Sequence, residues 1–98
     1  MAAYETRTKL LMQEALSRAR EFFEMQHGLP VQDRLGSLLR WRAAENDTIE
    51  LRAFPVKGGG TRLEIETVRN DDIVLAFIRQ LPQPGLLDEL RNRLRGRR

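Results

Sequence analysis

Cysteine is absent from this 98-residue sequence, so neither a disulfide framework nor a thiolate metal site can form. The lack of cysteine fits a reducing compartment, and we expect a cytoplasmic protein. Proline, histidine and aromatic residues are also scarce, with four prolines, one histidine, four phenylalanines, one tyrosine and one tryptophan. No apolar run approaches the roughly 20 residues that span a bilayer, and the first residues lack the apolar segment of a secretion signal. The length predicts one domain over residues 1–98.

The charge balance is uneven along the chain. The net charge is +3 and the isoelectric point is about 10.2, which by itself suggests a polyanionic partner. Five of the arginines lie in the last eight residues, and the remainder of the chain holds 12 basic against 14 acidic residues. The body of the protein is therefore not basic. Arg91, Arg93, Arg95, Arg97 and Arg98 form a candidate anion-contacting tail.

Two periodicities follow one another along the sequence. Apolar residues recur with helical spacing up to Phe23, which predicts a helix over residues 6–27 that ends before Gly28. Beyond Gly28 the period becomes two: Leu39, Trp41 and Ala43 alternate with arginines, and the segments 48–54 and 61–67 alternate in the same way. Short, turn-rich connections predict an antiparallel meander within residues 29–69. A weaker strand, LPVQDRL, precedes it, and its proline favours an edge position.

The C-terminal third returns to helical spacing. Asn70, Asp71 and Asp72 can cap a helix over 71–81, which prolines 82 and 84 end. A short basic helix over 86–95 carries a leucine stripe that includes Leu90 and Leu94. Each strand has one apolar face, so we predict a two-layer α+β domain of order α-β(3–4)-α, with both main helices on one face of a sheet of three or four strands and the short basic helix after them.

No catalytic constellation is visible in the sequence. His27 has no second metal ligand near it and fits the end of a helix, and Ser17 and Ser37 lack a neighbouring histidine. Glu64 and Glu66 share a strand face, but Arg52 can lie beside them, which indicates a solvated charge ladder. The glycine run KGGGT joins two strands and fits a hairpin turn better than a phosphate loop. We expect no enzyme activity, no cofactor and no metal.

Three functions remain open, in a fixed order of preference. The first is a non-catalytic protein-interaction or oligomerisation domain, and the second is binding of an apolar small molecule between the first helix and the sheet. For either, the candidate ligand or interface residues are Phe22, Phe23, Trp41, Leu90 and Leu94. The third is weak, non-specific nucleic-acid binding by the arginine tail. The predicted order resembles that of the double-stranded RNA-binding domain, but acidic residues stand where that domain presents basic ones.

Overall fold

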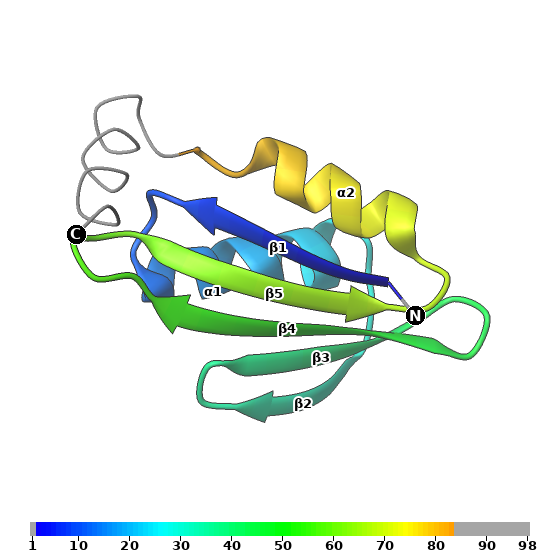
Figure 1. Ribbon diagram of the computed structural model, residues 1–98. Helices are drawn as coiled ribbons and strands as arrows, with labels where there is room; N and C mark the ends of the chain where they lie inside the picture. Colours follow the sequence, from blue (N-terminus) through cyan, green and yellow to red (C-terminus); the bar gives the residue numbers. More distant parts are fainter. Residues whose placement is uncertain (1, 84–98) are drawn as a thin grey trace.

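The computed structural model describes residues 2–83 as a small α+β domain with one five-stranded sheet and a helical layer on one of its faces (Figure 1). The strands are β1 (Ala2–Thr8), β2 (Val31–Leu35), β3 (Leu38–Ala43), β4 (Asp47–Pro55) and β5 (Thr61–Thr67). The helices are α1 (Met12–Arg20), its π-helical continuation η1 (Glu21–Gln26) and α2 (Asp71–Gln80).

All neighbouring strands are antiparallel, in the order β1-β5-β4-β3-β2. The meander of β3, β4 and β5 confirms the prediction from the period-two segments. The weaker segment before it is also a strand, and β2 occupies one edge of the sheet, as its proline indicated.

The prediction for the N-terminus was wrong. Residues 2–8 do not begin a helix: they form β1, which pairs with β5 from Ala2↔Thr67 to Thr8↔Thr61, and the first helix starts only at Met12. Tyr4, Thr6 and Thr8 alternate with Ala3, Glu5 and Arg7, a period of two that the helical pattern after Leu11 obscured. β-branched threonines fit a pleated strand, and pairing with β5 outweighs any local helical preference. The sheet therefore has five strands and the domain does not begin with a helix, so it lacks the element order of the RNA-binding domain.

The helices cover the apolar face of the sheet. α1 packs against β4 and α2 against β5, on the same side of the sheet (Figure 1). Trp41 is 0% exposed and faces this layer, which confirms the predicted register of β3. Burial of apolar side chains between the two layers is the main stabilising contribution. The core consists of Ala15, Ala19, Phe22, Phe23, Leu39, Trp41, Ile49, Leu51, Ala53, Leu63, Ile65, Val74, Phe77 and Leu81.

The end of the first helix widens into a π-helical turn before it stops. The amide of His27 donates to the carbonyl of Phe22, five residues back, at 3.1 Å. The wider turn buries both Phe22 and Phe23. Gly28 then adopts a φ of +65°, the left-handed conformation predicted for the residue that ends the helix.

The glycine-rich loop between β4 and β5 is a hairpin connection, as predicted, and its last glycine touches β1. Gly60 has a φ of +84°, and a Cβ atom there would lie 2.6 Å from the carbonyl oxygen of Thr8. A side chain at this position would therefore force β1 away from the hairpin or deform the loop.

We expect Gly60→Ala to lower the free energy of unfolding by about 2–3 kcal/mol, because the cost of placing alanine in a left-handed backbone conformation adds to the cost of the steric clash. Gly36→Ala is the matched control: Gly36 also has a positive φ, of +60°, but a Cβ atom there would have no other atom within 4 Å. It should cost only about 1 kcal/mol. Urea denaturation of both variants measures the difference, and equal losses would contradict a steric role for Gly60.

Candidate interaction site

The aromatic residues expected at a ligand or interface site lie in the core of the described domain. The Phe23 ring centroid is 4.6 Å from that of Trp41 and 5.1 Å from that of Phe77, and all three side chains are 0% exposed. The Trp41 indole N–H donates to the Glu24 carboxylate at 2.9 Å. The rings thus fill the space between the first helix and the sheet, where the sequence suggested an apolar ligand. The other candidates, Leu90, Leu94 and the five tail arginines, lie outside the described residues, as does the predicted helix over 86–95.

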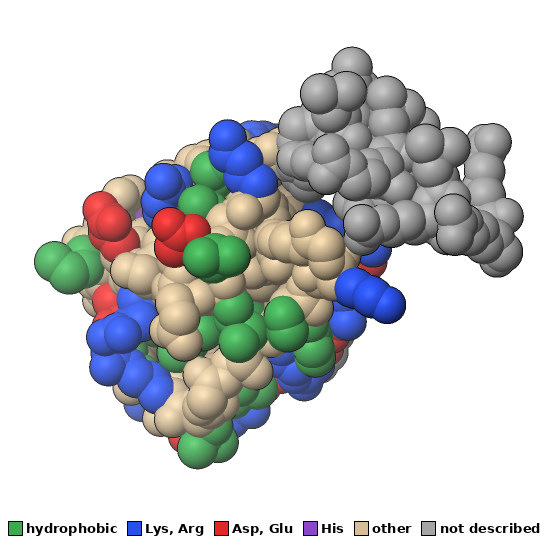
Figure 2. Space-filling model, turned by 90° about the vertical axis from the view of Figure 1, so that its left-hand side faces the viewer, with side chains coloured by type: hydrophobic (Ala, Val, Ile, Leu, Met, Phe, Trp, Pro, Cys, Tyr) green, Lys and Arg blue, Asp and Glu red, His purple; other side chains and the backbone are tan. Residues whose placement is uncertain are grey.

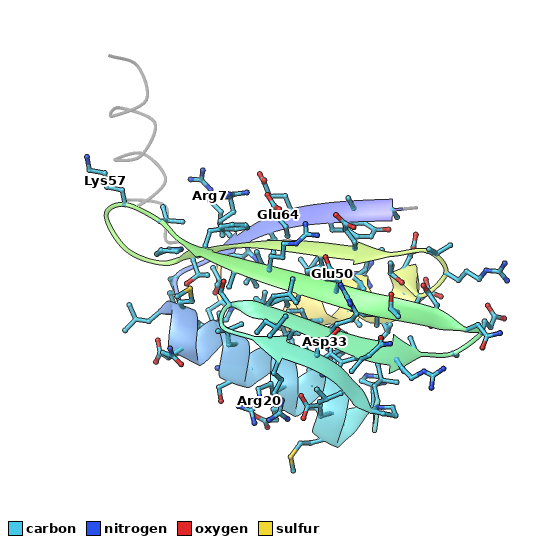
Figure 3. All side chains as sticks on the ribbon, turned by 90° about the horizontal axis from the view of Figure 1, so that it is seen from below. Arg7, Arg20, Asp33, Glu50, Lys57 and Glu64 are labelled. Carbon is cyan, nitrogen blue, oxygen red and sulfur yellow. The ribbon has the colours of Figure 1, made fainter. Side chains whose placement is uncertain are left out.

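The face of the sheet away from the helices carries a balanced set of charges. In Figure 3, Arg7 and Glu64 project on the opposite side of the sheet from Arg20 of α1. Five acidic and five basic residues occupy this face: Glu5, Asp33, Glu50, Glu64 and Glu66, with Arg7, Arg40, Arg42, Arg52 and Arg62. Each of the five acids forms an ion pair, and the predicted pairing of Arg52 with Glu64 or Glu66 is confirmed at 4.0 and 3.4 Å. The formal charges of these ten residues therefore cancel.

Glu50 lies at the centre of this face beside a shallow hollow. Its carboxylate accepts hydrogen bonds from the guanidinium groups of Arg40 and Arg52. The hollow has a volume of about 280 Å³ and is lined by Gln32, Arg40, Thr48, Glu50, Glu66, Thr67 and Val68. Within the hollow Arg40 is paired with Glu50, while Glu66 is paired with Arg52 beside it, and no histidine lines the hollow. The hollow thus holds two carboxylates, Glu50 and Glu66, that lie opposite each other in the register of β4 and β5 and are both ion-paired.

A buried carboxylate that sequence reasoning missed ties two loops together. Asp47, at the start of β4, is 7% exposed and accepts hydrogen bonds from the Thr67 hydroxyl, the Arg69 amide and the Asn70 side chain at 2.7–2.8 Å. Burial alone would raise the pKa of Asp47, but these bonds and one from the Thr48 amide outweigh it and hold the pKa well below its usual range. The sequence signal was weak, because an aspartate after Asn46 is equally typical of a solvated turn.

The same cluster corrects the predicted cap of the last helix. Asn70 does stand at the N-cap position of α2, but its side chain makes no capping bond. Its amide donates instead to Asp47 and to the carbonyl of Ala44. Asn70 therefore fastens α2 to the β3–β4 turn, a contact between segments that are distant in sequence. The cluster is a structural anchor.

The outer edge of β1 exposes the backbone of its odd-numbered residues. In the β4–β5 hairpin the Val56 amide donates to the Gly60 carbonyl, which assigns the even-numbered backbone groups of β5 to β4. The odd-numbered groups of β5 consequently face β1, where they pair with the even-numbered residues 2–8. The N–H and C=O groups of Ala3, Glu5 and Arg7 thus point away from the sheet, and within residues 2–83 they have no hydrogen-bond partner.

The two edges of the sheet differ in how they are protected. β2 is five residues long, follows Pro30 and has a bulge between Val31 and Asp33, features that discourage pairing with another strand. β1 is seven residues long, pairs without a bulge and contains no proline. α2 runs alongside β1 in Figure 1, and the Tyr4 hydroxyl of β1 donates to Asp71 of α2, but no strand of the described domain pairs with the outer edge of β1. The edge of β1 is therefore the candidate interaction site.

Large apolar side chains are exposed only at separate points of the described surface. They are Leu11, Met25, Leu35 and Val68, each more than half exposed and each in a different part of the chain. Figure 2, which faces the end of the molecule where β4 ends and β5 begins, shows hydrophobic side chains in small groups with basic ones around them. Scattered apolar residues of this kind are usual on protein surfaces and do not by themselves mark a docking site.

No protein-family model, curated protein or solved structure matches this chain. Within residues 2–83, no cluster of three or more histidine, aspartate or glutamate side chains is arranged to hold a metal ion. The helices described there are all too short or too polar to cross a membrane.

Proposed function

We propose that this chain is a non-catalytic interaction domain that takes up an extended protein segment as an additional strand beside β1. The observation that carries the proposal is the row of outward N–H and C=O groups at Ala3, Glu5 and Arg7. Strand addition at such an edge supplies affinity through backbone hydrogen bonds and specificity through alternate side chains.

Two further features support a protein partner. The open face next to β1 is balanced in charge, so it favours a segment of mixed charge over a polyanion. The aromatic residues between the helices and the sheet are packed against one another. The outward backbone groups of β1, in contrast, can still donate hydrogen bonds to a partner and accept hydrogen bonds from it.

Glu5→Pro tests the proposal. It removes an outward N–H, whereas the bonds between β1 and β5 belong to the even-numbered residues and stay intact. We expect peptides of about seven residues, selected from a random display library on the wild-type domain, to lose most of their affinity for this variant. Isothermal titration of the selected peptides with both proteins measures the loss.

Arg34→Pro is the matched control on the opposite edge. Arg34 pairs with Leu39, whose backbone faces β4, so the Arg34 amide also points outward. Each substitution removes one exposed ion pair, Arg34 with Glu24 or Glu5 with Arg62. Peptide binding should survive Arg34→Pro. A library that yields no binder sensitive to Glu5→Pro, while circular dichroism shows both variants folded, would refute strand addition at β1.

A further inference from the structure

We infer that the strand added beside β1 is β1 of a second copy of this chain, paired antiparallel about a two-fold axis at Thr6. The inference rests on the proposed function, because it names the partner of the same edge. The argument comes from the charges of β1, from the symmetry of an antiparallel pair and from the position of α2.

Within one copy, the two charged residues of β1 lie opposite like charges. Glu5 pairs in register with Glu64, and Arg7 pairs with Arg62. Like charges directly opposite one another on neighbouring strands are unfavourable. Arg62 partly compensates, because it reaches Glu5 diagonally at 3.0 Å, but Arg7 has no acidic partner within the described residues. The outer side of β1 is where an additional acid would be most favourable.

Symmetry leaves few registers for two β1 strands. When a two-fold axis is perpendicular to a continuous sheet, both copies present the same face on the same side of that sheet. Residues that lie opposite each other across the axis must therefore belong to the same face. An axis at Glu5 or at Arg7 would put two identical charges opposite each other. An axis at Thr6 instead places Glu5 opposite Arg7 of the partner subunit, and the reverse, on either side of the axis. Glu5 and Arg7 are also the residues whose backbone groups point outward, so the same pairs exchange N–H···O=C bonds.

The helical layer fits the same arrangement. The Tyr4 hydroxyl donates to Asp71 at 2.8 Å, which places this side of α2 over β1. Leu75 follows Asp71 by one helical turn, is only half-buried and does not belong to the core cluster. Because this side of α2 lies next to β1, a continuous sheet would bring a second α2 close to it and cover Leu75. The pairing would thus bury apolar surface as well as satisfy the edge.

Charge reversal tests the register. Glu5→Arg and Arg7→Glu should each weaken self-association at least about tenfold, because each turns the attractive pairs across the axis into repulsive ones. A mixture of the two variants should form a heterodimer, since every pair across the axis again joins opposite charges. The double variant Glu5→Arg/Arg7→Glu should dimerise like the wild type. Sedimentation equilibrium between about 1 and about 500 µM measures all four samples.

The monomer should tolerate both reversals, which keeps the test interpretable. A new arginine at position 5 faces Glu64, and a new glutamate at position 7 faces Arg62, so each change removes a like-charge pair within the sheet. Thermal unfolding of the variants at low concentration checks this directly. Leu75→Lys provides an independent test, because it leaves β1 unchanged and should also weaken the dimer.

The outcomes separate this inference from the proposed function. A wild-type chain that stays monomeric to about 500 µM, or a dimer that is insensitive to both single reversals, would refute pairing of two β1 strands about Thr6. If peptides still bind in a manner that Glu5→Pro abolishes, the edge takes up a different protein and the proposed function stands. If neither self-association nor peptide binding depends on β1, both proposals fail.

Discussion

Phe23→Ala should lower the free energy of unfolding by about 4 kcal/mol, which is a large part of the stability of a small domain. Phe23 is 0% exposed and lies among Phe22, Trp41 and Phe77, with ring centroids 4.6–5.1 Å away. Truncation removes a buried ring and leaves a cavity between helix and sheet that rigid neighbours fill only in part. Urea denaturation followed by circular dichroism measures the loss.

Phe54→Ala is the control for ring loss without core loss. Phe54 lies on the open face of β4, where the Arg62 guanidinium stacks 4.4 Å from its ring centroid. Its replacement should cost only about 1 kcal/mol, the size of a partly exposed cation–π contact and its accompanying burial. Similar losses for the two variants would mean that the aromatic cluster does not form the core of the folded protein.

Asp47→Asn should lower the free energy of unfolding by about 2–3 kcal/mol at neutral pH. The carboxylate accepts bonds from four backbone or side-chain groups at the end of β5 and in the β5–α2 connection, as well as from the Thr48 amide. An amide in its place turns one acceptor into a donor that faces other donors. Asp33→Asn is the control, because the Asp33 side chain is 40% exposed and its ion pair with Arg40 is solvated.

The Asp47 carboxylate should also make the free energy of unfolding depend on pH. Hydrogen bonds hold the pKa of Asp47 below its usual range in the folded state, so its contribution is fully present above the unfolded pKa of about 3.9 and is lost as the pH falls below it. The wild type should therefore lose stability more steeply than Asp47→Asn between about pH 4 and about pH 2. Parallel curves for the two proteins in urea denaturation would contradict this role.

The sequence could predict much of the fold but little of the candidate site. The alternation around Trp41 predicted the buried face of β3, because shifting a strand by one residue would bury Arg40 and Arg42. Phe22 and Phe23 were selected as candidate ligand or interface residues, yet nothing local distinguishes an aromatic residue that packs in a core from one that lines a ligand site. That distinction depends on which rings meet, and the rings of this cluster come from the continuation of α1, from β3 and from α2.

By itself, the sequence determined the features that depend on neighbours along the chain. These are the amphipathic helices, the three-stranded meander, the end of the first helix at Gly28 and the edge position suggested by Pro30. Only the tertiary structure decided the rest. Residues 2–8 form a strand because they pair with β5, and Asp47 is buried and hydrogen-bonded because the β5–α2 connection passes over it. β1 is an open edge because no strand of the described domain lies beyond it. The pairing of β1 and the burial of Asp47 depend on contacts between residues 20 or more positions apart, and local sequence patterns do not predict the energies of such contacts.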